Sequence, residues 1–412
     1  MLSNKVLNTL IPSAVPITLK RVLSIDAFRA LTMLLMIFVN DFWSLSGIPY
    51  WLEHAKADED MLGFSDIIFP CFLFILGMAI PFAIESRLVK GDSKGLIVRY
   101  ILARSVALLV MGVFTVNTPD LNEQATGMRR EWYQILMVIG FFLIWNVYPQ
   151  RDKSQTYIFW GLQALGVGLL LYLAFIFKGG DSSAPVGMKP QWWGILGLIG
   201  WTYLTCALLY LIAYQNQKVL FLAWFVFTFF SVAGHAGWLK ALWPTGPHEW
   251  ILGNGAFHAF AMTGLLGTLL MEWFYRKNKK TQLPSIFTSI GVAMVLVGLL
   301  LRNFFIISKI QATPTWVFLC SGIAFMLFAL LFFGVELRGK AKWFNPIKVA
   351  GTATLTCYLI PYVYYSVAAM LPFSLPEALK YGVVGLMKSM LYALIVIGIA
   401  AALGRLNIKL KI

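Results

Sequence analysis

Three consecutive stretches of sequence decide the fold: residues 21–42 read RVLSIDAFRALTMLLMIFVNDF, residues 43–65 read WSLSGIPYWLEHAKADEDMLGFS, and residues 66–84 read DIIFPCFLFILGMAIPFAI. The first and third are apolar and close to the ~20 residues with which a helix crosses hydrocarbon. The middle stretch is a loop that holds His54 with one lysine and four carboxylates, Glu53, Asp58, Glu59 and Asp60. Because histidine titrates nearest to neutral pH, this loop is a candidate site of acid–base chemistry at a membrane boundary. The excess of carboxylates also favours a cationic substrate.

The whole chain has the composition of an integral membrane protein. Of its 412 residues, 59% are hydrophobic and 12% are charged, and the mean hydropathy is +0.75. A soluble domain carries about twice that charged fraction. The net charge of +15 does not indicate nucleic-acid binding, because the basic residues are spread over short loops. The four cysteines have no close pairs, so we expect neither a disulfide framework nor a metal site.

Apolar runs recur along the chain at lengths typical of spanning helices. They predict an all-α polytopic membrane protein of about 12 transmembrane helices, with 10 or 11 as alternatives. We expect one membrane domain, 24–404, between an N-terminal leader, 1–23, and a basic tail, 405–412. The runs lie at 27–44, 66–86, 96–117, 131–148, 157–177, 192–214, 219–241, 251–274, 284–307, 313–334, 347–370 and 380–403.

The basic residues also predict an orientation. If the N-terminus is cytoplasmic, most of the 33 lysines and arginines fall on the cytoplasmic side, as the positive-inside rule requires. Both termini are then cytoplasmic and His54 lies on the outer face.

Short motifs in fixed order carry a family resemblance: SIDAFR at 24–29, LM and VN within 35–40, HA at 54–55, SDIIFP at 65–70 and FLFILG at 72–77. Together they resemble the transmembrane acyltransferases typified by heparan-alpha-glucosaminide N-acetyltransferase, and within that family its bacterial sugar-utilisation branch. The resemblance implies a homodimer in a bacterial inner membrane that passes the acetyl group of cytoplasmic acetyl-CoA to an amino sugar outside.

The resemblance also implies catalytic roles. His54 is the proposed base or acetyl carrier, Asn40 lies beside the reacting acetyl group, and Asp66 orients His54. From the residues alone, Asp66 is equally a cap of the helix that it opens.

Further candidates lie elsewhere in the chain. Asp26 and Arg29 share a helix face with Asn40, and either bind coenzyme A or form an ion pair that fixes helix depth. Arg104 and Ser105 are candidates for the phosphates of coenzyme A. A histidine in a membrane segment is by default a functional-site hypothesis, so His258 is a substrate-binding candidate. The others are Asn254, Glu53, Asp41, Arg130 and Lys309.

Two other functions stay open. A transporter of sugars or amino sugars fits twelve spans, but needs inverted repeats and broken helices. An O-acyltransferase acting on a surface glycan shares the chemistry and differs in its acceptor. The sequence does not separate N- from O-acetylation, or direct transfer from an acetyl-histidine intermediate.

Overall fold

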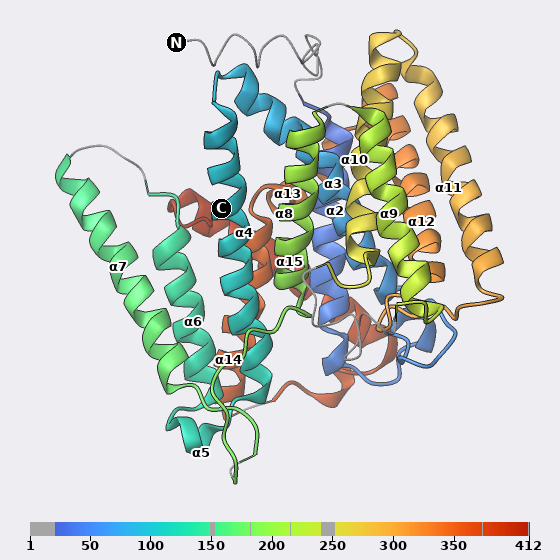
Figure 1. Cartoon of the computed structure of the whole chain (residues 1–412). Helices are drawn as coiled ribbons and strands as arrows, with labels where there is room; N and C mark the ends of the chain where they lie inside the picture. The colour runs from blue at the N-terminus through green and yellow to red at the C-terminus, as the bar shows by residue number, and fades with distance from the viewer. Residues whose placement is uncertain are drawn as a thin grey trace.

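The structure, a computed structural model, describes residues 21–148, 153–181, 183–214, 216–239, 252–372, 374–410 and 412. Over these ranges the protein is helical and has no regular strand, which confirms the predicted all-α class (Figure 1). Most of the predicted leader, 1–23, lies outside the described residues.

A helix occupies each of the twelve predicted runs. Within the described part, nine helices are long and apolar enough to cross a membrane. Three helices in the predicted runs are not among these nine. Helices α6 and α14 have 16 and 17 residues, and α10 carries Glu272 among its apolar residues. A multi-pass membrane protein is therefore confirmed, while the count of twelve crossings stays a prediction. The twelve helices are α2 (Leu23–Asn40), α3 (Ser65–Val89), α4 (Lys94–Asn117), α6 (Arg130–Trp145), α7 (Lys153–Ile176), α8 (Ile195–Ala213), α9 (Gln217–His235), α10 (Ala256–Arg276), α11 (Leu283–Leu301), α12 (Pro314–Phe332), α14 (Thr354–Met370) and α15 (Gly382–Arg405).

The predicted run 347–370 is not one helix. A 3-10 turn, η7 (Lys342–Ile347), leads into the short α13 (Lys348–Thr352), and α14 begins only after a break at Ala353, where φ is −122° and ψ is 40°. A Cβ on Gly351 would lie 3.0 Å from the carbonyl oxygen of Asp26. The glycine therefore lets α13 lie directly against α2.

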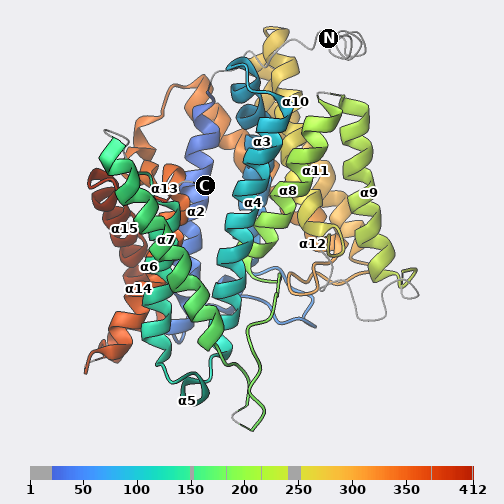
Figure 2. The ribbon, with the colours of Figure 1, turned by 60° about the vertical axis from the view of Figure 1, so that its left-hand side comes forward.

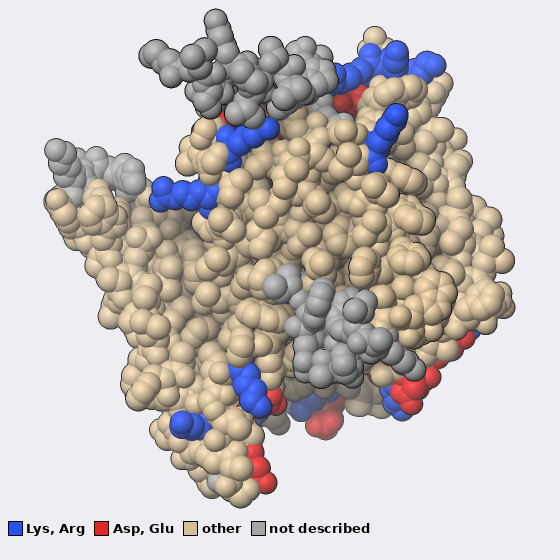
Figure 3. All heavy atoms as spheres, viewed as in Figure 1, with Lys and Arg blue, Asp and Glu red and all other residues tan. Residues whose placement is uncertain are grey.

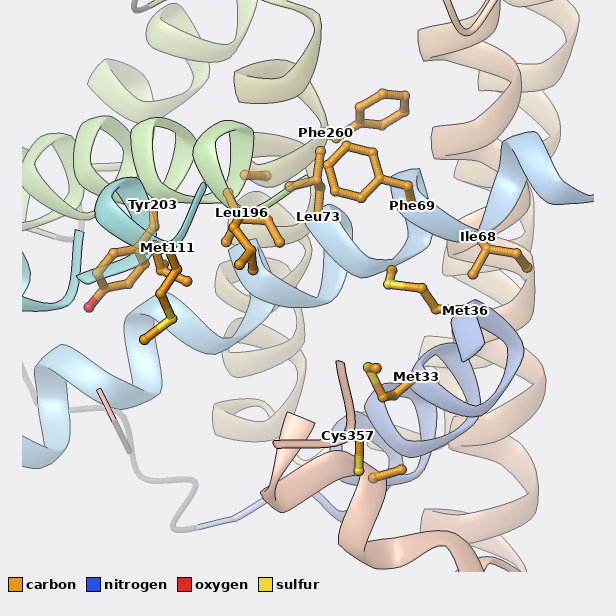
Figure 4. Close-up of a cluster of buried hydrophobic side chains, with 14 of the residues drawn as sticks. Met33, Met36, Ile68, Phe69, Leu73, Met111, Leu196, Tyr203, Phe260 and Cys357 are labelled. Carbon is orange, nitrogen blue, oxygen red and sulfur yellow. The ribbon is translucent and has the colours of Figure 1, made fainter. Parts of the chain in front are cut away.

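Helix α2 is central, because it packs against α3, α12, α13, α14 and α15 (Figures 1 and 2). Met33 and Met36 of α2 lie between α3, which carries Phe69, and α14, which carries Cys357 (Figure 4). Helix α3 in turn packs closely on α10. A Cβ on Gly77 would lie 1.7 Å from the carbonyl oxygen of Ala261, so only glycine allows this backbone approach.

One face of the molecule has an apolar middle band (Figure 3). On the face shown in Figure 3, uncharged residues cover the middle of the molecule and the charged side chains gather at its two ends. Charged groups are costly to place in hydrocarbon, so this distribution is the one expected of a chain that crosses a bilayer.

Candidate functional site

His54 and Asp66 form a close pair at the start of α3. The Asp66 side chain is only 1% exposed, and its Oδ1 lies 2.7 Å from His54 Nδ1. Its Oδ2 accepts hydrogen bonds from the backbone amides of Ala55, at 3.0 Å, and Gly63, at 3.2 Å. The carboxylate therefore holds the loop that carries the histidine.

The pairing also assigns the histidine tautomer. An ionised carboxylate only accepts hydrogen bonds, so Nδ1 of His54 carries the proton and donates it to Asp66. Nε2 then keeps its lone pair, and Lys309 Nζ lies 3.5 Å from it. Since the His54 side chain is 45% exposed, Nε2 is available to take a proton from a bound substrate.

Lys309 completes the cluster from the loop between α11 and α12. Its Nζ lies 3.7 Å from Asp66 Oδ1 and 3.1 Å from His54 Nδ1. Burial lowers the pKa of Lys309, and the charge of Asp66 opposes this shift. A buried carboxylate needs a nearby positive charge, so Lys309 is placed to neutralise Asp66 beside the imidazole.

Hydrogen bonds attach the His54 loop to the loop between α11 and α12. Asp60 Oδ2 accepts from Arg302 Nε at 2.8 Å, and Asp60 Oδ1 accepts from the amide of Ile307 at 2.7 Å. The carbonyl oxygen of Ala57 accepts from Ser308 Oγ at 2.8 Å. Partial burial raises the pKa of Asp60, but the Ile307 amide and Arg302 outweigh it and hold that pKa below its ordinary value.

The carboxylates of this loop are less free to attract a cationic substrate than the sequence suggests. Asp60 pairs with Arg302, and Glu59 pairs with Lys56 at 3.8 Å and accepts a hydrogen bond from the Tyr50 hydroxyl. Glu53, a predicted substrate-binding residue, is partly exposed beside His54. Two of the four loop carboxylates, Asp60 and Glu59, thus help to fix the loop.

Gly63 sets the shape of the loop. A Cβ at this position would lie 1.9 Å from the carbonyl oxygen of Glu53, which no rotation of a side chain could relieve. The close crossing is stabilised by the amide of Phe64, which donates to the carbonyl oxygen of Trp51 at 2.8 Å. The position of His54 therefore depends on Gly63, which lies nine positions later in the sequence and has no side chain.

A cavity of about 440 Å³, which we call the arginine cavity, follows α2 from Arg21 to Met36. Its charged residues lie toward the N-terminal end of α2: Arg21, Asp26 and Arg29, with Arg104 from α4. Asp26 pairs with Arg21 at 2.7 Å and with Arg29 at 3.7 Å. The predicted pair of Asp26 and Arg29 thus exists, and it lines a cavity.

Arg104 has spare hydrogen-bonding capacity in this cavity. Its Nε is buried without a hydrogen-bond partner among the described residues, and its guanidinium lies 4.7 Å from the centre of the Tyr203 ring. A buried unpaired donor next to two other arginines fits an anionic ligand such as a phosphate. Ser105 is also buried, but it does not line the arginine cavity.

A second cavity, of about 480 Å³, is lined by Trp192, Trp193 and Trp201, and we call it the tryptophan cavity. It shares Ile195 with the arginine cavity, and Lys309, which contacts His54, also lines it. The predicted residues His258 and Asn254 both lie here.

The amide of Asn254 is already used within the protein. It donates to the carbonyl oxygen of Ala312 at 2.8 Å and accepts from the amide of Ala256 at 3.0 Å. Asn254 therefore joins the start of α10 to the Lys309 loop, while His258 is a lining residue of the cavity.

A third cavity, of about 800 Å³, is lined by Tyr358, Tyr362, Tyr365 and Tyr392, and we call it the tyrosine cavity. It contains the predicted residues Asn40 and Arg130, with Gln134 and Ser366, and it shares Met33 and Tyr358 with the arginine cavity. The structure therefore places Asn40 and Arg130 together, and in a different cavity from Lys309.

Asp41, predicted to bind substrate, is 2% exposed and engaged within the protein. Its Oδ2 accepts from Lys388 Nζ at 2.7 Å and from Ser389 Oγ, and its Oδ1 accepts from the Tyr365 hydroxyl. These contacts tie the end of α2 to α14 and α15. The sequence analysis missed Lys388, although a lysine inside the predicted span 380–403 is itself a signal of this kind.

The fold and these cavities define a multi-pass membrane protein with a His–Asp–Lys cluster around the buried Asp66 carboxylate at one end and three arginines that line a cavity toward the other. Residues 21–274, more than half of the chain, match the model of the family described as domain of unknown function DUF5009, and the chain belongs to that family. It is also 37% identical over 98 residues to heparan-alpha-glucosaminide N-acetyltransferase from Homo sapiens and from Mus musculus. Each match covers 24% of this chain and 14% of the relative.

Proposed function

We propose that this protein is a transmembrane acetyltransferase that passes the acetyl group of cytoplasmic acetyl-CoA to an amino sugar on the outer side of the membrane. The pair of His54 and Asp66, 2.7 Å apart, carries the proposal, because it leaves Nε2 of a partly exposed imidazole as a base. The proposal is further supported by the named activity of the relatives, which are N-acetyltransferases.

The donor end of the proposed reaction rests on the arginine cavity. Coenzyme A carries phosphates that do not cross lipid, and Arg21, Arg29 and Arg104 are the groups of this cavity that would bind them. From Asp26 to Met36 the helix rises by about 15 Å. A thioester on an extended arm can therefore be held deep in the membrane while its phosphates stay at the basic end.

In the proposed reaction the acceptor nitrogen attacks the carbonyl carbon of the thioester while His54 Nε2 takes its proton. The carbon–sulfur bond then breaks, and the leaving thiolate takes the proton from His54. Asp66 stabilises the imidazolium that forms between these steps, because its charge lies against Nδ1. A step through acetyl-histidine instead would place the acetyl group on Nε2 first.

The test uses proteoliposomes with acetyl-CoA inside and glucosamine outside, and mass spectrometry of the external sugar. The His54→Gln variant should lose acetyl transfer. His235→Gln is the matched control, since both nitrogens of His235 contact backbone oxygens, those of Ser231 and Gln311. Retained turnover in His54→Gln contradicts the assignment, and sugar uptake without acetyl-CoA favours a transporter instead.

The donor end has its own test. Arg104→Met should raise KM for acetyl-CoA by about 10- to 150-fold, because a charge-assisted hydrogen bond contributes about 1.5–3 kcal/mol. Arg99→Met, which removes an exposed arginine of the same helix, is the control. Equal KM values in the two variants would remove the arginine cavity from the donor site.

The remaining parts of the proposal concern the setting of the reaction. We propose that both termini are cytoplasmic and that the protein is a homodimer in a bacterial inner membrane. Accessibility of single cysteines introduced at Lys90 and Asp58 to a membrane-impermeant maleimide checks the orientation. Labelling of position 90, and not of 58, from outside intact cells contradicts it.

A further inference from the structure

Unpaired polar atoms belong to residues that line the tryptophan cavity. Nδ1 and Nε2 of His258, Nε1 of Trp201 and Oγ1 of Thr202 are all buried without a hydrogen-bond partner among the described residues. His258 is 2% exposed and Thr202 is 0% exposed, and both line the cavity. A buried polar group left unpaired costs about 1–3 kcal/mol, so the polar residues of this lining favour a ligand with several hydrogen-bonding groups.

The walls between these polar atoms are aromatic. Trp192 and Trp201 meet edge to face with their rings 5.5 Å apart, and Phe257 and Phe69 also line the cavity. The imidazole of His258 stacks on Phe227 at 5.0 Å, which fixes the direction of its nitrogens. Flat apolar walls with a few fixed polar groups suit a ring that has apolar faces and polar edges.

The cavity carries little charge. Among the described residues that line it there is no carboxylate, and the one charged side chain is Lys309, which contacts His54. A cationic group has no counter-charge inside the cavity, whereas neutral hydroxyl groups can bond to Thr202, Trp201 and His258. The volume of about 480 Å³ lies in the usual range of small-molecule sites.

We infer that the tryptophan cavity binds the hydroxyl-bearing ring of the acceptor sugar, with Thr202, Trp201 and His258 bonding to ring hydroxyls remote from the reacting group. The reacting amine then lies toward Lys309 and His54. That the bound sugar acts as an acetyl acceptor rests on the proposed function, whereas the binding of its ring to this cavity does not. Thr202 and Trp201 become determinants of sugar specificity.

Binding is tested without chemistry, in His54→Ala protein with no acetyl-CoA, by saturation-transfer NMR titration of glucosamine and its 3-, 4- and 6-deoxy analogues. Adding Thr202→Val should weaken glucosamine binding by about tenfold, the value of one hydrogen bond. One of the deoxy analogues lacks the hydroxyl that bonds to Thr202. Thr202→Val should therefore not weaken the binding of that analogue any further. Thr228→Val is the control, since that hydroxyl donates to the Trp224 carbonyl oxygen at 2.9 Å and lines none of the three cavities.

Each outcome decides the inference. The inference is overturned if Thr202→Val and Thr228→Val bind glucosamine with equal affinity. It is also overturned if Thr202→Val weakens the binding of glucosamine and of every deoxy analogue by the same factor. The absence of any sugar binding also overturns it, because the cavity then holds water only. Binding that depends on Thr202 together with no acetyl transfer in protein with His54 intact supports the sugar site and overturns the proposed function.

Discussion

Asp66→Asn tests the central pair with a change of one atom. Asp66 is 1% exposed and accepts from His54 Nδ1 at 2.7 Å, and an asparagine in the same place is neutral and offers an amide that donates. A hydrogen bond to a charged partner is worth about 1.5–3 kcal/mol. At about 1.4 kcal/mol per tenfold change in rate, its loss lowers kcat by about 10- to 150-fold.

The reversed tautomer adds to this loss, because an amide that donates to Nδ1 places the proton on Nε2, where the base is needed. The assay is the initial rate of acetyl transfer at saturating sugar, with KM for acetyl-CoA measured alongside. We expect kcat to fall and this KM to stay unchanged, since the arginine cavity lies toward the other end of α2.

The matched control is Asp60→Asn, which alters the same loop through Arg302 and makes no contact with His54. Both variants are checked for an unchanged elution volume in size-exclusion chromatography. A kcat for Asp66→Asn within twofold of that of the unaltered protein refutes the reasoning, because it shows that the carboxylate does not act on the imidazole.

Three further predictions concern the loop and the buried ion pair. Gly63→Ala should abolish acetyl transfer without loss of helicity by circular dichroism, because its Cβ would lie 1.9 Å from a carbonyl oxygen, whereas Gly95→Ala, with nothing within 4 Å, should be neutral. Because the pKa of Asp60 is lowered in the fold, its stabilising contacts are complete above the ordinary aspartate pKa of about 4 and are lost as pH falls below it. The protection factors of the loop amides, which are exchange rates corrected for the intrinsic effect of pH, should therefore fall in acid, and Asp60→Asn should remove that fall; an unchanged pH profile of these factors counts against the linkage. Lys388→Met should destabilise the protein by about 3–5 kcal/mol, because it leaves the charge of Asp41 buried and unpaired, and adding Asp41→Asn should restore part of the loss in thermal unfolding; no restoration would show that the pair is not coupled.

The sequence predicts the helices well because hydrophobic runs of spanning length are a strong and local signal. The break at Ala353 escapes this signal, since residues on both sides of it are apolar and the cause is a contact elsewhere. Gly351 must approach the backbone of Asp26, and no pattern within residues 347–370 shows that.

In the candidate site, too, contacts between residues close in sequence could be predicted, and contacts between distant parts of the chain could not. His54 and Asp66 are twelve residues apart and their pairing could be anticipated, whereas Lys309 reaches them from a distant loop. The helix period places Asp26 and Arg29 on the side of α2 that carries Asn40, and all three line cavities. The helix period does not show that Asn40 lies in a different cavity from Lys309, because the division into cavities depends on which helices surround α2.

The bonds from Asp60 and Ala57 to residues 302–311 also impose an order on biosynthesis. The first helices of a nascent chain can enter the membrane early, and Asp66 can already bind His54, but the bonds of Asp60 and Ala57 form only after residues 302–308 have been made. A chain stalled before residue 302 would thus lack the bonds that attach the His54 loop to residues 302–308. The contacts between this loop and residues 302–311 therefore form only after residue 302 of the 412 has been translated.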